Sequence, residues 1–300
     1  MPLSASVIDK GSTVAWLGLG TMGVPMARRL FSAGYHLRGY NRTSRPDFSD
    51  LPFPLFSSPA ECLSGSPLVI LMVRDGIASR ELLEGERGVL SAIYPGQIVV
   101  NMSTIAPEEA REEARRVREK EGIYFDIPVS GSVVPAGRGE LLLLAGGDER
   151  FRSAIEPPLS VLGSKLHWFG PAGSGMAAKL AINFLLASHM QSLVEVLSAG
   201  EGLGLDRKEL ADAISDSPLA TPFSRIKFRN LLEENYAKAF SASLMEKDLD
   251  LLERALGPHK PSLPSLSIVH ALYQKALEDG LGEQDLSIIQ EILKNSPGNS

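Results

Sequence analysis

The sequence predicts an α/β fold, in which a Rossmann-type doubly wound sheet is joined by a long helix to an all-helical carboxyl-terminal domain. From Thr13 to about Gly170, strand-like runs alternate with helical stretches, the pattern of a parallel sheet with crossover helices. After Pro171, the apolar-periodic stretch Gly175–Ala199 contains no proline, and no convincing strand follows it. We therefore expect a disordered extension at residues 1–12, a sheet domain at 13–171 and a helical domain at 172–295.

Seven short apolar runs supply the expected strands. Several are apolar along their whole length, as in strands covered on both faces. They are Thr13–Leu17, Leu37–Tyr40, Leu68–Val73, Ile98–Met102, Tyr124–Val129, Leu141–Ala145 and Leu166–Phe169. Two intervening helices have clear ends, because Met22–Ala33 stops at Gly34 and Pro107–Glu121 stops at Gly122.

Composition excludes several classes of protein. The net charge is −6 with both signs interspersed, so no basic face is available for nucleic acid and a small-molecule partner is favoured. The single cysteine, Cys62, rules out an internal disulfide.

The longest apolar runs fall short of the ~20 residues that span a bilayer. Met1–Ser12 also lacks the pattern of a signal peptide, so we expect a cytoplasmic protein. We expect no metal, because the histidines lack ligand spacing: His36, His167, His189, His259 and His270.

A glycine-rich turn follows the first strand directly and precedes the first helix. Its residues are Gly18, Leu19, Gly20, Thr21, Met22 and Gly23, which form a GxGxxG pattern. The first glycine permits a tight turn, the second lets a pyrophosphate approach the backbone, and the third lets the helix pack on the strand. In this strand-turn-helix setting, the pattern predicts dinucleotide binding.

The residues after the second strand favour NADP(H) over NAD(H). An NAD-selective protein would usually place Asp or Glu there for the ribose hydroxyls. This chain has Asn41, Arg42 and Thr43 instead. The Arg42 guanidinium can bind a 2′-phosphate through charge-assisted hydrogen bonds, and its neighbours can add neutral ones. We also assign Met72 and Val73, at the end of the third strand, to the cofactor site.

Lys179 and Asn183 lie four residues apart in Gly175–Asn183, and so project from one face of a largely apolar helix. An exposed lysine there would be an ordinary solvated side chain. In a cleft, desolvation would lower the pKa of Lys179 toward neutrality, where it can give up a proton.

At this point the sequence resembles the β-hydroxyacid dehydrogenase family. Four motifs match in order over nearly the whole chain: Gly18–Gly23, Asp126–Ser132, Gly175–Asn183 and Lys247–Leu249. Within the family, the chain is most similar to glyoxylate and succinic semialdehyde reductases, which share Asn-Arg-Thr and Ser-Gly-Ser. One departure is Arg74, a charge where relatives usually have a smaller or uncharged residue.

The resemblance implies a role for each matching residue. Lys179 is the implied catalytic acid, Asn183 orients the substrate, and Thr104 lies near both nicotinamide and substrate. It further implies that the substrate carboxylate is held by Ser130, Gly131 and Ser132, that Phe240 and Asp248 are active-site side chains, and that Lys247 contacts the cofactor. Because members associate through the helical domain, the resemblance also implies a homo-oligomer, either a dimer or a tetramer.

We therefore expect NADPH-dependent reduction of a small carboxylate-bearing aldehyde or keto acid, such as glyoxylate or succinic semialdehyde. A 3-hydroxyisobutyrate-type dehydrogenase is the nearest alternative. An imine reductase is disfavoured, because such enzymes commonly replace the lysine at the position of Lys179. From another class, a non-catalytic NADPH-binding scaffold remains open, since fold alone does not establish function.

Overall fold

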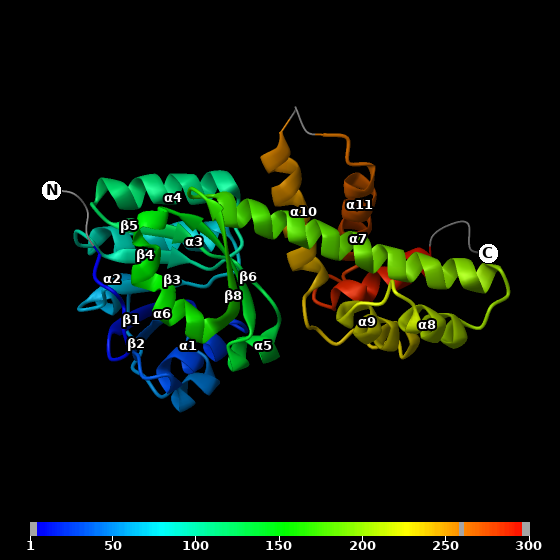
Figure 1. Cartoon of the computed structure of the whole chain (residues 1–300), viewed down its shortest axis with the longest axis horizontal. Coiled ribbons are helices and arrows are strands. Elements are labelled where there is room, and N and C mark those ends of the chain that lie inside the picture. The colour runs from blue at the N-terminus through cyan, green and yellow to red at the C-terminus, as the bar shows by residue number, and fades with distance from the viewer. Residues whose placement is uncertain (1–4, 258–260, 296–300) are drawn as a thin grey trace. The chain divides into compact units, whose positions relative to one another are not determined.

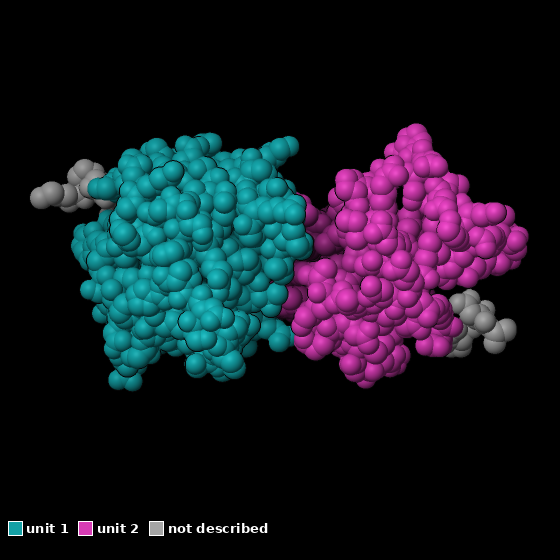
Figure 2. Space-filling model, turned by 90° about the horizontal axis from the view of Figure 1, so that it is seen from below, with its two compact units in different colours: residues 1–179 teal, residues 180–300 magenta. Residues whose placement is uncertain are grey.

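The computed structural model describes residues 5–257 and 261–295. The chain divides into two compact units, Met1–Lys179 (unit 1) and Leu180–Ser300 (unit 2), which Figure 2 colours separately. Unit 1 is a sheet covered by helices and unit 2 is helical, so the predicted fold class is confirmed (Figure 1).

The sheet of unit 1 has eight strands in the order β2-β1-β3-β4-β5-β7-β6, with β8 paired to β7. The strands from β1 to β5 are parallel, so their carboxyl ends share one edge of the sheet. The strands are β1 (Thr13–Leu17), β2 (His36–Tyr40), β3 (Leu68–Leu71), β4 (Ile98–Asn101), β5 (Ile123–Asp126), β6 (Val129–Ser130), β7 (Leu141–Gly147) and β8 (Gly163–Gly170).

The far end of the sheet is mixed, whereas the sequence pattern predicted parallel strands throughout. β7 runs antiparallel to both β5 and β6. The expected strand Tyr124–Val129 is also divided, because Pro128 has no N–H for a ladder hydrogen bond. A short helix, α5 (Val133–Arg138), then reverses the chain and ends at Gly139 in the left-handed conformation.

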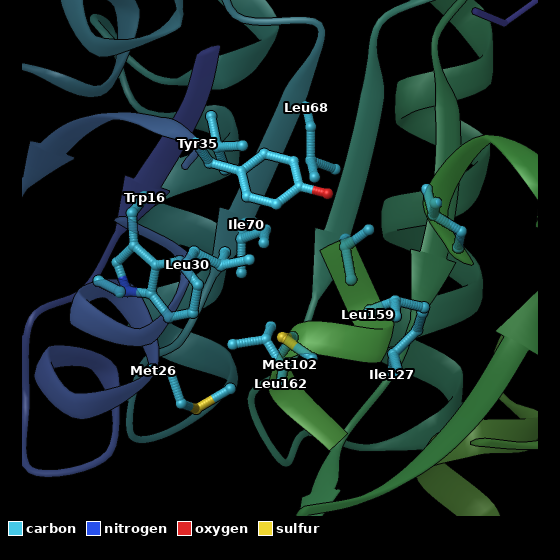
Figure 3. Close-up of a cluster of buried hydrophobic side chains, with 14 of the residues drawn as sticks. Trp16, Met26, Leu30, Tyr35, Leu68, Ile70, Met102, Ile127, Leu159 and Leu162 are labelled. Carbon is cyan, nitrogen blue, oxygen red and sulfur yellow. The ribbon is translucent and has the colours of Figure 1, made fainter. Parts of the chain in front are cut away.

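Alternate side chains of each central strand enter two different cores, as expected of a sheet covered on both faces. One core packs Trp16 and Ile70 against α1 (Gly23–Ser32) and α6 (Arg152–Leu162), and Figure 3 shows part of it. The other core packs residues such as Leu17 and Val69 against three helices: α2 (Pro59–Leu63), α3 (Gly76–Glu84) and α4 (Pro107–Glu119).

The expected disordered extension is partly wrong. Ile8 is buried in the first core, and its backbone N–H donates to the carbonyl of Ala154 at 2.9 Å. The hydroxyl of Tyr35 also donates to the carbonyl of Ile8. The apolar side chain of Ile8 and its two hydrogen bonds therefore help attach this segment to unit 1, while residues 1–4 lie outside the described residues.

Unit 2 is built from helices packed on a single apolar core. Buried tyrosine, methionine and leucine side chains from several helices meet there, among them Met190, Met245 and Tyr273. The helices are the later part of α7 (Ser174–Gly202), then α8 (Arg207–Asp216), α9 (Pro222–Leu232), α10 (Ala242–Leu256), α11 (Pro264–Glu278) and α12 (Ile289–Lys294).

Among the described residues, α7 is long and apolar enough to pass for a membrane-spanning helix by length and composition alone. The sequence predicted no span, because its uninterrupted apolar runs are much shorter than this helix. Long helices of soluble cores meet the same criteria. Here Ala187, Met190 and Val194 on α7 are buried in the core of unit 2.

Candidate functional site

The glycine-rich turn between β1 and α1 leaves space where a ligand could approach the backbone. Gly18 has φ +104°, and a Cβ added to it would lie 2.2 Å from the carbonyl oxygen of Met72. A Cβ on Gly23 would lie 2.0 Å from the carbonyl oxygen of Gly18. Protein packing therefore requires both glycines. By contrast, a Cβ on Gly20 would meet no atom within 4 Å, so this glycine leaves open space beside the turn, which fits a dinucleotide phosphate.

The other predicted cofactor residues follow neighbouring strands at the same sheet edge. Asn41–Thr43, Met72–Val73 and Thr104 come after the carboxyl ends of β2, β3 and β4, respectively. Asn41 connects two of the loops, because its Oδ1 accepts from the N–H of Leu19 at 2.8 Å and its Nδ2 donates to the carbonyl of Thr43 at 2.7 Å. Asn41 thus has a structural task beyond the predicted phosphate contact.

Arg42 has a carboxylate partner that was not predicted from the sequence. Its Nη1 lies 2.9 Å from Oε2 of Glu81 on α3, and both side chains are more than half exposed. Arg74, the unusual charge after β3, is exposed as well. The cationic group expected to face a 2′-phosphate is therefore already paired with an anion in this structure.

A buried polar network holds the loops after β3 and β4. Oγ of Ser103 accepts from the N–H of Val73 at 2.9 Å, and Oδ1 of Asn101 accepts from the N–H of Ser103 at 3.0 Å. The Nδ2 of Asn101 donates to Glu113 on α4 at 2.8 Å. These bonds fix the loop after β3, which contains Val73, against the loop after β4, which contains Thr104.

Glu113 is 5% exposed and no cation pairs with it among the described residues. Its carboxylate accepts from the hydroxyls of Ser79 and Tyr124 as well as from Asn101. Burial raises the pKa of Glu113, and these hydrogen bonds oppose the shift only in part. The network is therefore well satisfied but remains costly to charge.

Asp126, the last residue of β5, holds the first turn of α7. It is fully buried, and its two carboxylate oxygens accept from the N–H groups of Gly173 at 2.8 Å and Met176 at 2.9 Å. Burial raises the pKa of Asp126 to about 6, although the backbone hydrogen bonds act in the opposite direction. Lys179 lies about one and a half turns into α7 and is 8% exposed, so Asp126 places it near the carboxyl end of β5.

The predicted carboxylate-binding residues also lie at this edge. Ser130 ends β6, which runs in the same direction as β5, and Ser132 is the N-cap of α5. Between them, Gly131 has φ +141°, and a Cβ there would lie 2.7 Å from a methyl carbon of Leu141. The turn therefore needs glycine, and it leaves Ser130 and Ser132 partly exposed.

In unit 2, three predicted residues are in contact. Nδ2 of Asn183 donates to Oδ2 of Asp248 on α10, and Nζ of Lys247 lies 2.8 Å from Oδ1 of the same carboxylate. Asn183 and Asp248 are almost fully buried. Lys179 and Asn183 share one face of α7 by their spacing of four residues.

Phe240 precedes α10 and is half-buried, and its backbone is held by Asp285. Oδ2 of Asp285 accepts from the N–H of Phe240 at 3.2 Å, while the other carboxylate oxygen pairs with the buried ammonium of Lys227. Burial alone would raise the pKa of Asp285, but Lys227 and the hydrogen bonds from Ser287 outweigh it and hold the pKa below its usual value.

Several residues of the site were missed from the sequence. Glu81 and Asp285 each contact a predicted residue from a distant part of the chain, Arg42 and Phe240 respectively. Asn101 and Glu113 form the hydrogen-bonded network beneath the loop that leads to Thr104. No spacing rule relates such pairs. For Asp126 a signal existed, since it opens the motif that contains Ser130. In the described part of the chain, no group of three or more His, Cys, Asp or Glu side chains could hold a metal ion.

Two family models match consecutive parts of the chain. Residues 13–170 match the NAD-binding domain of 6-phosphogluconate dehydrogenase. Residues 173–293 match the NAD-binding domain of NADP-dependent 3-hydroxyisobutyrate dehydrogenase. Together the two models cover both units.

Three relatives show the range of named activities. The mitochondrial 3-hydroxyisobutyrate dehydrogenase of Pongo abelii is 32% identical, over 97% of this chain and 89% of its own. The NAD-dependent L-serine dehydrogenase of Pseudomonas aeruginosa is 31% identical over 95% and 99%. The chloroplastic glyoxylate/succinic semialdehyde reductase 2 of Arabidopsis thaliana is 29% identical over 94% and 79%.

Proposed function

Because this chain belongs to the β-hydroxyacid dehydrogenase family and is an NAD(P)-dependent oxidoreductase acting on CH–OH groups, we propose that it reduces glyoxylate or succinic semialdehyde with NADPH. One observation carries the proposal. Asp126 fixes the start of α7 at the carboxyl end of β5, and so Lys179 belongs to the same sheet edge as the open space at Gly20.

Lys179 acts as the general acid in this proposal. When bound, NADPH supplies the hydride that reduces the carbonyl carbon. Negative charge then develops on the carbonyl oxygen, where the Lys179 ammonium stabilises it and transfers one proton. The burial of Lys179 favours this role, because water competes less for a buried ammonium.

The substrate carboxylate is assigned to the turn after β6. The hydroxyls of Ser130 and Ser132 and the backbone amides beside Gly131 provide hydrogen-bond donors at this turn. Asn183 orients the substrate, while Thr104 lies beside the nicotinamide and the substrate. Phe240, Asp248 and, toward the cofactor, Lys247 complete the proposed set.

NADPH rather than NADH follows from Asn41, Arg42 and Thr43, which include no carboxylate to repel a 2′-phosphate. The NAD-dependent relative shows that the family also contains enzymes of the opposite preference.

The second candidate is a 3-hydroxyisobutyrate-type dehydrogenase. It is favoured because the relative with that name has a higher identity to this chain than the named reductase has.

The experiment is a panel of initial rates. Purified protein is assayed with glyoxylate, succinic semialdehyde, methylmalonate semialdehyde and a cyclic imine, using NADPH and NADH in parallel. We expect turnover of either of the first two, with higher kcat/KM for NADPH. Activity confined to methylmalonate semialdehyde would favour the dehydrogenase, and cofactor binding without any turnover would favour a scaffold.

A homo-oligomer is part of the proposal, as a dimer or a tetramer. Leu185 and Val196 on α7 are 68% and 36% exposed in the single chain, and a second copy could remove them from water. We keep the cytoplasmic location as a proposal, since the named relatives include mitochondrial and chloroplastic proteins.

A further inference from the structure

The ion pair between Arg42 and Glu81 joins two segments of unit 1 that are far apart in sequence. Arg42 lies in the loop after β2, and Glu81 lies on α3. Asp75 caps this helix by accepting from the N–H of Ala78 at 2.9 Å, so the position of Glu81 is fixed by a well-formed helix. The carboxylate thus reaches Arg42 from a defined element of the fold.

A carboxylate and a phosphate compete for the same N–H donors of an arginine. Both accept hydrogen bonds from the guanidinium fork, and both are anions. A 2′-phosphate bound at Arg42 would have to displace Glu81 or share the fork with it. In either case the phosphate would lie near a second negative charge, which weakens its binding.

Two further carboxylates, Glu84 and Glu109, lie in the same region as the Glu81 carboxylate that pairs with Arg42. A surface hollow beside it is lined by residues that include Arg80, Glu84 and Glu109. Glu109 is occupied by the N–H of Ala106 at 2.9 Å, as a capping interaction of α4. Glu84 lies on the same helix as Glu81, so it provides a matched acidic control.

We propose that Glu81 is a specificity-determining residue, which holds Arg42 in an ion pair and reduces the preference for the 2′-phosphorylated cofactor. The inference rests on the proposed role of Arg42 in binding that phosphate. The enzyme therefore prefers NADPH over NADH by a smaller factor than its Asn-Arg-Thr sequence alone predicts. Because both side chains are more than half exposed, the effect is modest and falls at high ionic strength.

The test measures binding and not turnover. Isothermal titration calorimetry is performed with adenosine 2′,5′-bisphosphate and with AMP, which differ only in the 2′-phosphate. We expect Glu81→Gln to tighten binding of the bisphosphate about two- to fivefold at low salt and to leave AMP unchanged. Glu84→Gln should have a smaller effect, and the gain from Glu81→Gln should disappear in an Arg42→Ala background.

The variants separate the inference from the function on which it rests. If Arg42→Ala weakens the bisphosphate but Glu81→Gln leaves it unchanged or weakens it, the inference is overturned and the NADPH assignment stands. If Arg42→Ala changes binding of neither nucleotide, the NADPH assignment and the inference both fail. An equal gain for AMP and the bisphosphate would also overturn the inference, because the effect would then not involve the 2′-phosphate.

Discussion

The side-chain amide of Asn183 on α7 donates a hydrogen bond to the carboxylate of Asp248 on α10, which lies 65 residues away in the sequence. Asp248 is 2% exposed, and its other oxygen pairs with Lys247. A buried carboxylate that loses a donor keeps its desolvation cost. Asn183 therefore stabilises unit 2 in addition to its proposed contact with the substrate.

We predict that Asn183→Ala lowers the free energy of unfolding by about 1–3 kcal/mol, because Asp248 loses a buried hydrogen-bond donor. Asn183→Asp should be worse at neutral pH, since it places two carboxylates together. Urea denaturation checks both values. The double variant Asn183→Asp with Asp248→Asn exchanges the two groups and should recover part of the loss. Equal free energies of unfolding for Asn183→Ala and Asn183→Asp would contradict this explanation.

The glycine-rich turn allows packing and ligand binding to be separated. Gly20→Ala should leave the free energy of unfolding unchanged, because its Cβ would meet no protein atom within 4 Å. The same Cβ would occupy the space assigned to the pyrophosphate, so NADPH should bind about tenfold or more weakly. Thermal melting and fluorescence titration measure the two effects. Gly23→Ala is the control that should destabilise the fold, and undiminished NADPH binding by Gly20→Ala would argue against the site.

The buried Glu113 predicts a pH dependence of stability. Its folded pKa is raised from the reference value of 4.5, so the folded state binds the proton more tightly than the unfolded state does. The contribution of Glu113 to the free energy of unfolding is therefore fully present below pH 4.5, and it is lost as the pH rises through the folded pKa. Glu113→Gln removes this loss, and its stability relative to the wild type should increase with pH.

Urea denaturation across this pH range tests the sign of the effect. Glu113→Leu is the matched control, because it leaves the donors of Asn101 and Tyr124 without their acceptor. It should cost about 1–3 kcal/mol. Parallel stability curves for the wild type and Glu113→Gln would show that Glu113 does not titrate as described.

Much of the sheet was predictable because its signals are local. Runs such as Leu68–Leu71 are apolar along their whole length, and the glycine-rich turn marks the start of the first helix. The antiparallel placement of β7 was not predictable, since the residues of a strand do not specify the direction of its neighbour. The buried place of Ile8 was missed for a similar reason, because its partner Ala154 lies far along the chain.

For the candidate site, residues within motifs could be identified, and the residues that support them could not. Asn183 and Lys179 were found through their spacing on one helix. The partners Glu81 and Glu113 reach their targets only after the chain folds. Their functional importance comes from packing geometry, which no single-sequence pattern encodes.

Lys179 is proposed to supply the proton, and single-turnover kinetics with Lys179→Met tests this role most directly. Methionine preserves the length and apolar stem of the side chain but cannot donate a proton. With saturating NADPH and glyoxylate or succinic semialdehyde, the rate of NADPH oxidation should fall by about 10²- to 10⁴-fold, while the Kd for NADPH stays unchanged. A variant that oxidises NADPH at the wild-type rate would contradict the mechanism.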